Sequence, residues 1–194
     1  MGNLASISNM LNRLGIPSRL ASRPEEVASA EALILPGVGA FDTGMRRLKE
    51  SGLAEALDQK VRTCRAPLLG ICLGMQLFAR GSEEGSEVGF AWIDASCIRL
   101  RGGPLKVPHM GWNTVEVVKR TPLLEGLEVS KFYFVHSFYL SLGNADHLVA
   151  ETRHGSAFPS VVEAGNLIGV QFHPEKSHKY GMRLLKNFSD HYLT

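Results

Sequence analysis

The stretch PLLGICLGMQLF, residues 67–78, carries the clearest structural signal in the sequence. Its first half is a short apolar run typical of a strand buried on both faces, and its second half has the composition of a helix. Cys72 stands between Gly70 and Gly74, where the run changes character. Glycines on both sides remove Cβ atoms where the backbone must crowd. The stretch therefore predicts a strand that reverses sharply into a helix, with the cysteine at the turn.

Helix and strand signals alternate through the first half of the chain. The expected helices cover 3–14, a segment capped by Ser22, residues 42–63 with a break at Gly52, and 178–192; the expected short strands cover 32–37 and 66–71. The second half is β-rich with turn signals between its segments. We expect an α/β fold: three layers, a mainly parallel sheet flanked by helices, and an added antiparallel β portion.

Composition narrows the classes of protein. The chain has 194 residues, of which 44% are hydrophobic and 21% charged, with a formal net charge of +2. This favours one domain over residues 1–194 and gives no electrostatic footprint for nucleic acid. Three widely spaced cysteines predict neither a zinc site nor a disulfide framework, so we expect no metal, no cofactor and a reducing, cytoplasmic compartment. No stretch is apolar for long enough to span a membrane.

The turn at Cys72 predicts a nucleophile. A thiol at this position lies above the carboxyl ends of the strands, where open α/β sheets bind ligands. The helix that begins there favours the thiolate, and the amide N–H of Leu73 points at the reacting centre as an oxyanion donor. The alternative is a buried structural cysteine, because free cysteine is among the most buried residue types.

A cysteine nucleophile needs a base, and QFHPE (171–175) supplies one. His173 follows the apolar segment LIGV at a strand's carboxyl end, and Glu175 lies two residues further on. A carboxylate there fixes the tautomer and orientation of the imidazole while the ring takes the thiol proton. A satisfied structural histidine is the alternative, but the cysteine turn upstream favours catalysis.

Three segments together resemble a known family. PGVGAF (36–41), GICLGMQLF (70–78) and QFHPEKS (171–177), in that order, resemble class I glutamine amidotransferases over nearly the whole chain. Within that family, MGNL (1–4), VPHMGWN (107–113) and YFVHSF (133–138) resemble the glutaminase subunits of imidazole glycerol phosphate synthases, which serve histidine biosynthesis.

The resemblance implies hydrolysis of glutamine to glutamate and ammonia through a γ-glutamyl thioester. It assigns the catalytic roles to Cys72, His173 and Glu175, and the oxyanion donors to Val38 or Gly39 together with Leu73. The substrate-binding residues that it implies are Gly37, Gln76, His136, Ser137 and Phe138. The structural alternatives stay open at this point, because PGVG also fits a strand-ending turn and YFVHSFYL also fits a core strand.

The resemblance also implies a partner, a (β/α)8-barrel cyclase that receives the ammonia. Residues in the matching stretches that face the barrel are Asn3, Met110, Trp112 and Lys176. Trp112 is the expected anchor, because buried tryptophans often dominate interface energy. Its alternative role is a core aromatic residue.

Two features depart from the family's pattern. Members usually begin with a short apolar strand before the MGNL segment, and here that strand is absent, so we expect the sheet to lack its first strand. Losing it leaves backbone groups unpaired, so we expect this chain to be less stable than one extended by ~7 apolar residues. Phe138 stands where tyrosine is common.

Two other functions compete with this one. The first is another glutaminase of the same class, such as that of pyridoxal phosphate synthesis, against which VPHMGWN and YFVHSF count. The second is a scaffold that binds a barrel but no longer hydrolyses glutamine, against which the intact Cys72, His173 and Glu175 count.

Overall fold

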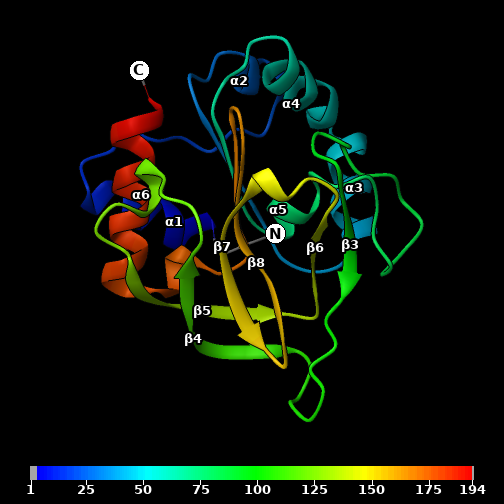
Figure 1. The fold of residues 1–194 in the computed structure, drawn as a ribbon. Helices are drawn as coiled ribbons and strands as arrows, with labels where there is room; N and C mark the ends of the chain where they lie inside the picture. Colours follow the sequence, from blue (N-terminus) through cyan, green and yellow to red (C-terminus); the bar gives the residue numbers. More distant parts are fainter. Residues whose placement is uncertain (1–3, 194) are drawn as a thin grey trace.

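The computed structural model describes residues 4–193 and contains a large mixed sheet with helices on both faces (Figure 1). Asn3 lies outside the described residues. The helices are α1 (Leu4–Arg13), α2 (Pro24–Ala28), α3 (Phe41–Glu50), α4 (Leu53–Arg62), α5 (Leu73–Gln76) and α6 (His178–Tyr192), with 3-10 turns η1 (Pro122–Leu124), η2 (Ala145–His147) and η3 (Pro174–Lys176). The strands are β1 (Leu33–Gly37), β2 (Leu68–Cys72), β3 (Ala95–Arg99), β4 (His109–Val117), β5 (Val129–His136), β6 (Phe138–Leu142), β7 (Leu148–His154), β8 (Ser156–Ala164) and β9 (Leu167–Val170).

The strand order of the large sheet is β1-β2-β9-β8-β7-β4-β5, and β3 pairs with β6 in a second, two-stranded sheet. The pairs β1–β2 and β2–β9 are parallel, whereas the pairs from β9 through β8, β7 and β4 to β5 are antiparallel. The expected α/β architecture with an added antiparallel portion is confirmed. Antiparallel pairs are more numerous than the sequence indicated, because most strands of the β-rich second half extend the large sheet, while β3 and β6 form the small one.

Alternating side chains of the parallel strands enter two cores. Leu69 and Ile71 of β2 belong to the core that α1 and α6 cover, while Leu68 of the same strand belongs to the core that α3 and α4 cover. Successive residues of a strand point to opposite faces, so an apolar strand of this kind buries both. The helices therefore form the two outer layers, with α1 and α6 on one side of the sheet in Figure 1 and α3 and α4 on the other.

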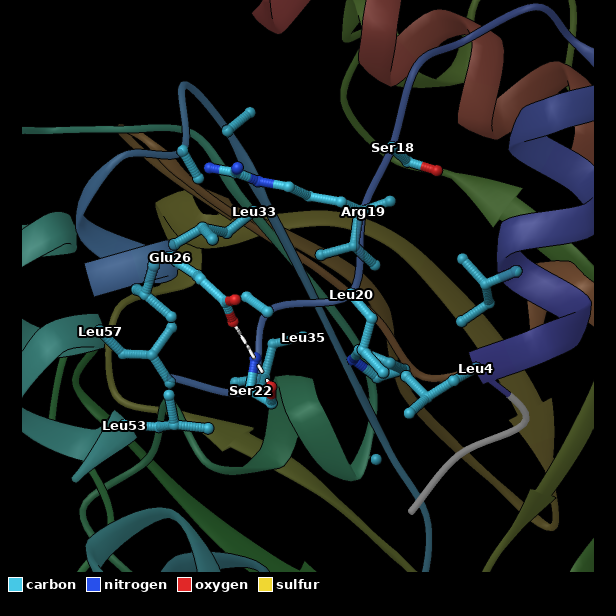
Figure 2. A pocket seen from close by; sticks show the side chains of 18 of the residues that line it. Leu4, Ser18, Arg19, Leu20, Ser22, Glu26, Leu33, Leu35, Leu53 and Leu57 are labelled. Carbon is cyan, nitrogen blue, oxygen red and sulfur yellow. Dashed lines mark hydrogen bonds between the residues drawn. The ribbon is translucent and has the colours of Figure 1, made fainter. Parts of the chain in front are cut away.

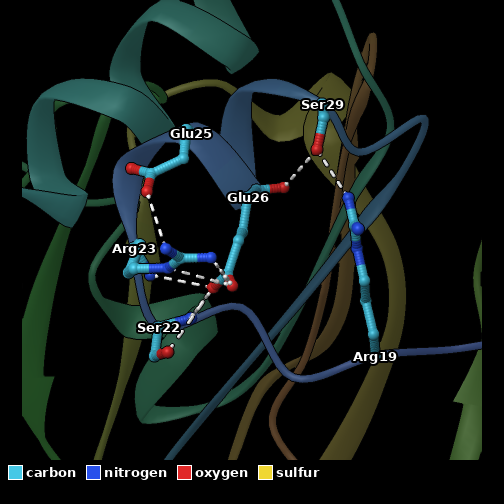
Figure 3. A network of polar contacts seen from close by, with 6 residues as sticks. All are labelled: Arg19, Ser22, Arg23, Glu25, Glu26 and Ser29. Carbon is cyan, nitrogen blue, oxygen red and sulfur yellow. Dashed lines mark hydrogen bonds and ion pairs between the residues drawn. The ribbon is translucent and has the colours of Figure 1, made fainter.

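The cap of α2 differs from the expected one. Arg23, not Ser22, is the N-cap residue, and Pro24 occupies the first helical position. The Glu26 carboxylate accepts hydrogen bonds from the backbone N–H groups of Ser22 (2.8 Å) and Arg23 (3.0 Å), as Figure 3 shows. The bond from Ser22 and the contacts with Arg23 lower the pKa of Glu26 to about 2. The helix start is thus stabilised by a carboxylate reaching back from its first turn.

β1 lies at the edge of the large sheet and, among residues 4–193, pairs with β2 alone. Beside its free edge runs a groove of about 1580 Å³, lined by β1, α1, α4 and the segment 16–22. Figure 2 shows leucine side chains, among them Leu33, Leu35, Leu53 and Leu57, around this groove. Apolar side chains therefore line the groove, and the outer edge of β1 has no strand partner among residues 4–193.

Filling this groove is expected to raise stability. An apolar extended segment of ~7 residues fused ahead of Met1 has β1 as a pairing edge and the groove's leucines as packing partners, which stabilises by a few kcal/mol and raises the thermal midpoint by roughly 6–12 °C. Calorimetry of the fused and unfused chains measures this shift. A fused segment of equal length made of serine and aspartate is the control, and equal midpoints for all three chains would contradict the expectation.

Candidate active site

Cys72 ends β2 and begins α5, and its backbone is strained. It adopts φ 53° and ψ −111°, a conformation that a residue with a Cβ rarely occupies. The glycines on either side leave no room for side chains: a Cβ on Gly70 would lie 2.8 Å from backbone atoms of Met75, and one on Gly74 would collide with the Leu35 carbonyl. The spacing of glycines therefore serves close packing, and it produces the sharp turn that the sequence predicted.

A pocket of about 290 Å³ opens in front of Cys72. Seven of the residues expected from the sequence line it: Gly39, Cys72, Leu73, Gln76, His136, Ser137 and Phe138. The segments come from three separate parts of the chain, which the pairing of the strands brings together. Its volume lies near the lower end for small-molecule sites, so it suits a ligand of amino-acid size.

The segment 37–39 contributes unequally to this pocket. Gly39 lines it and has a φ of +96°, a conformation that glycine tolerates at no steric cost. Gly37 lies one step back, where an added Cβ would come within 2.8 Å of Leu73 and Gly74. Val38 is 40% exposed and does not line the pocket. The structure thus places Gly39 beside the nucleophile, with Gly37 packed against the turn behind it.

His173 and Glu175 lie buried behind the thiol. The exposed fractions of their side chains are 1% and 2%, and His173 Nδ1 lies 2.8 Å from Glu175 Oε1. The backbone of His173 is held by hydrogen bonds with Tyr133 and Ser177. Because a carboxylate only accepts hydrogen bonds, Nδ1 carries the proton that it shares with Glu175. Nε2 is the ring nitrogen left to exchange a proton with another group.

The electrostatics of His173 depend on its two neighbours. Burial lowers the pKa of its imidazole, but interactions with the Cys72 thiol and the Glu175 carboxylate outweigh burial and raise the pKa to about 9. Its Nε2 has no hydrogen-bond partner among residues 4–193, although it is buried. An unpaired buried nitrogen is costly unless a ligand or reaction partner uses it. The nitrogen is therefore available for proton transfer at the thiol.

Glu84 and Gln171 contribute to this site, although the sequence did not predict them. Glu84 lines the pocket, and its carboxylate accepts a hydrogen bond of 2.7 Å from the backbone N–H of Phe41. Gln171 is fully buried, and its Nε2 lies 3.6 Å from the Cys72 sulfur. Gln171 precedes His173 by two residues, on the same strand periodicity, which is a signal for a shared face. Glu84 lies in a loop and gave no such signal.

Gln76 and Phe138 form the inner wall of the pocket. The Gln76 side-chain amide donates to the Phe138 carbonyl (2.8 Å) and to Gln171 Oε1 (3.2 Å). Its Oε1 is the atom left for a ligand, because both amide hydrogens are used. The amide thus ties β6 to the nucleophile turn.

Met110, Trp112 and Lys176 lie at the surface near one another. Trp112 is 47% exposed and Met110 62% exposed, which rules out a core role for Trp112. The Trp112 ring stacks on His178 (5.5 Å) and meets Tyr133 edge-on (6.3 Å), and Lys176 Nζ lies 5.5 Å from the Tyr133 ring. We call this surface, Met110, Trp112, Tyr133, Lys176 and His178, the tryptophan patch.

Two classes of feature are missing from the described part of the chain. Residues 4–193 hold no group of three or more histidine, cysteine or acidic side chains arranged to bind a metal ion. None of the helices that they form has the length and apolar character needed to cross a membrane.

Comparison of the sequence with known proteins gives one family throughout. Residues 4–191 match the family described as Glutamine amidotransferase class-I. The chain is 47% identical to the imidazole glycerol phosphate synthase subunit HisH 2 of Pseudomonas aeruginosa, over 97% of this chain and 94% of that protein. It is 45% identical to the subunit HisH of Bdellovibrio bacteriovorus, over 98% and 96% of the two chains.

Solved structures agree at the level of the fold. A glutamine amidotransferase crystal structure superposes with a TM-score of 0.76 at 23% identity, covering 97% of this chain and 93% of that one. The crystal structure of a glutamine amidotransferase from Thermotoga maritima superposes with a TM-score of 0.63 at 18% identity, covering 95% and 76% of the two chains. The family match and the near-full-length relatives establish that this chain belongs to the class-I glutamine amidotransferases.

Proposed function

We propose that the chain is the glutaminase subunit of an imidazole glycerol phosphate synthase. It hydrolyses glutamine to glutamate and ammonia at Cys72 and passes the ammonia to a (β/α)8-barrel cyclase of histidine biosynthesis. The observation that carries this proposal is the strained turn at Cys72, with a pocket in front of it and a buried His173–Glu175 pair behind it. The relatives named HisH support the choice of synthase.

Glutamine binds through groups that match its charged amino-acid end. The Glu84 carboxylate lines the pocket and complements the substrate's ammonium group, while Gln76 Oε1 offers an acceptor nearby. The side-chain amide of the substrate then lies toward Cys72, between Leu73 and Gly39. A pocket that accepts one small amino acid in one orientation converts an encounter into an oriented attack.

The reaction then proceeds through two tetrahedral intermediates. The thiol proton moves to His173 Nε2, and the sulfur attacks the substrate's amide carbon, so that a C–S bond forms and the carbonyl oxygen takes negative charge. Backbone N–H groups of Leu73 and the 38–39 segment stabilise that oxygen. His173 returns its proton to the nitrogen, the C–N bond breaks, and ammonia leaves. Water, activated by the same imidazole, cleaves the thioester to release glutamate and restore the thiol.

The high pKa of His173 suits the step in which ammonia leaves. With a pKa of about 9, the ring holds the transferred proton at neutral pH until the amide nitrogen takes it. Glu175 keeps the ring in the orientation that aims Nε2 at the reacting atoms. Direct transfer to a partner also has a chemical reason, because ammonia released into neutral water is protonated and loses its nucleophilicity.

The tryptophan patch is the proposed docking surface for the barrel. Its exposed aromatic and methionine side chains are of the types enriched at the centre of interfaces, and Lys176 lies against the ring of Tyr133. Asn3, which the sequence also assigned to this interface, lies outside the described residues.

Replacing Trp112 with alanine is expected to weaken the complex with the barrel by ~2 kcal/mol or more, about 30-fold in Kd. The reason is the loss of a large, half-exposed aromatic anchor. Titration calorimetry of variant and parent chains against the cyclase barrel measures it. Val118→Ala is the matched control, because Val118 is 59% exposed just beyond the far end of β4. Equal affinities for the parent and both variants would remove Trp112 from the interface.

Glutamate release tests the whole proposal. It is measured for the chain alone, for the chain with a cyclase barrel, and for both with the barrel's nucleotide substrate or an analogue of it. We expect almost no glutamate release by the chain alone and strongly increased release in the full mixture. Full activity without the barrel points instead to a free-standing glutaminase or another amidotransferase of the family. Silence in all three mixtures favours a scaffold without activity.

A further inference from the structure

A chain of hydrogen bonds, with two buried imidazoles at its centre, crosses from β4 to the wall of the pocket. Asn113 Nδ2 lies 3.1 Å from His109 Nε2, His109 Nδ1 lies 3.0 Å from His136 Nε2, and His136 Nδ1 lies 2.9 Å from the Phe138 carbonyl oxygen. The two imidazoles are 4% and 6% exposed. Neither His109 nor Asn113 lines the pocket, so the chain reaches the site from outside it.

The partners at both ends fix where every proton lies. The Asn113 amide is oriented by two further bonds, Nδ2 to the Arg153 carbonyl (3.0 Å) and the Thr114 N–H to Oδ1 (2.8 Å). Its nitrogen therefore donates, and His109 Nε2 must accept. At the other end the Phe138 carbonyl can only accept, so His136 Nδ1 must donate. Two neutral rings satisfy both conditions only if each carries its proton on Nδ1, which also makes His109 the donor to His136.

The surroundings keep both rings neutral. Burial lowers the pKa of His109 to about 4, and the neighbouring His154 adds to this effect. Burial outweighs the bond to the Phe138 carbonyl and lowers the pKa of His136 to about 3, and the neighbouring His109, His154 and His173 lower it further. An added proton on His136 Nε2 would also face the N–H of His109. The directional chain is thus the stable arrangement near neutral pH.

The chain of hydrogen bonds ends at groups that hold Cys72 in place. The Phe138 carbonyl that accepts from His136 also accepts from Gln76, whose amide bonds Gln171, and Gln171 donates to the Cys72 sulfur. At its other end the chain lies on β4, whose alternate residues Met110 and Trp112 belong to the tryptophan patch. One strand therefore carries both the exposed patch and the first links of the chain.

We propose that His109 is a positioning residue for glutamine hydrolysis: locked by Asn113 with its proton on Nδ1, it makes His136 donate to the Phe138 carbonyl and so fixes the pocket wall opposite Cys72. This role rests on the proposed glutaminase function. Small errors in the placement of a substrate wall lower rates strongly, because attack requires a near-ideal geometry.

The protonation states are read directly from the unmodified chain by long-range ¹H–¹⁵N NMR of its imidazoles at pH 7. We expect His109 and His136 both to be neutral with the proton on Nδ1. A proton on Nε2 of either ring, or a doubly protonated ring, would overturn the proposal whether or not the chain hydrolyses glutamine.

Steady-state kinetics then test whether this chain of hydrogen bonds positions the wall of the pocket. His109→Phe keeps the ring stacking with Phe134 but removes both hydrogen bonds. We expect kcat/KM for glutamine to fall 10- to 100-fold in the mixture that activates the parent chain, and His136 to lose its single tautomer. His109→Gln, which keeps one donor and one acceptor, is expected to recover most of the loss.

His154→Phe is the matched control. The His154 ring stacks on His109 at 4.3 Å but bonds only the Lys106 carbonyl, outside the chain of hydrogen bonds. We expect its kinetics to stay within about 2-fold of the parent. Unchanged kinetics in folded His109→Phe would make His109 merely structural, whereas a parent chain without glutaminase activity in any mixture would remove the proposed function instead. If His109→Phe fails to fold, the kinetics of His109→Gln and the parent's NMR spectrum decide. A folded His109→Gln chain whose kcat/KM falls by the full 10- to 100-fold would contradict the proposal.

Discussion

Replacing Cys72 with alanine is expected to abolish glutamine hydrolysis, lowering kcat by at least about 10⁴-fold. Alanine leaves no atom that can form the γ-glutamyl thioester, so only the oriented pocket and its oxyanion donors remain. Glutamate release by the variant in the activating mixture measures the loss. The partner's affinity is expected to stay the same, because Cys72 is buried and is not part of the exposed tryptophan patch.

The other two cysteines supply the control for this variant. Cys64 is exposed, and Cys97 is buried with its pKa raised to about 12, mainly by burial. Neither lines the pocket, so Cys64→Ala is expected to hydrolyse glutamine as the parent does. Glutamine hydrolysis that persists in Cys72→Ala would show that Cys72 is not the nucleophile. Simultaneous loss of barrel binding would show that the cysteine is structural.

Replacing Glu175 with glutamine is expected to lower turnover about 10²- to 10⁴-fold without unfolding the chain. The amide keeps the shape of the carboxylate but loses the charge that stabilises the imidazolium at 2.8 Å. It also allows the ring to turn or to adopt the other tautomer. Steady-state glutaminase assays, with the thermal midpoint recorded in parallel, measure both effects.

The same substitution is expected to change the pH profile in a defined direction. Burial alone lowers the pKa of His173, and the Cys72 and Glu175 interactions raise it to about 9. Since the protonated ring is the acid for ammonia departure, activity falls as the pH rises through that value. Without the Glu175 charge the fall begins at lower pH. Glu163→Gln, a half-buried carboxylate bonded to Thr121 and Tyr192 away from the pocket, is the control and is expected to leave the profile unchanged.

The nucleophile turn could be predicted because its causes are local. Gly70, Cys72 and Gly74 are close in sequence, and the crowding that excludes a Cβ at Gly70 comes from Met75 of the helix that follows. Only at Gly74 does another strand contribute, through the Leu35 carbonyl of β1. The positions of His173 and Glu175 followed from a similar local rule, a strand end followed by proline. Short apolar strands and amphipathic helices were also recognisable for this reason, since their side chains repeat at the period of the element.

The missed features depend on contacts between distant segments. Glu84 enters the pocket because its loop packs against the start of α3, where it caps Phe41. His109 meets His136 only because β4 and β5 pair in the register that places these two residues opposite one another. The greater antiparallel share of the sheet has the same origin, because strand pairing is not encoded within any one strand.

The cap of α2 shows a smaller limit of local reasoning. Ser22 is a favourable N-cap residue, but Glu26 reaches the backbone of both Ser22 and Arg23, so the helix begins one residue later than expected. Pro24 takes the first helical position, where proline is favoured, only when Arg23 is the N-cap residue, and the Glu26 carboxylate supports the same register.

Covalent trapping shows whether Cys72 is the nucleophile in an assembled pocket. The Cys64→Ser chain, which lacks the exposed thiol, is treated with a chloroketone analogue of glutamine in the activating mixture and examined by peptide mass spectrometry. We predict a single adduct on Cys72 that excess glutamine prevents, with Cys97 unmodified. An unmodified Cys72 in a chain that still hydrolyses glutamine, or an adduct that glutamine does not prevent, would contradict the account.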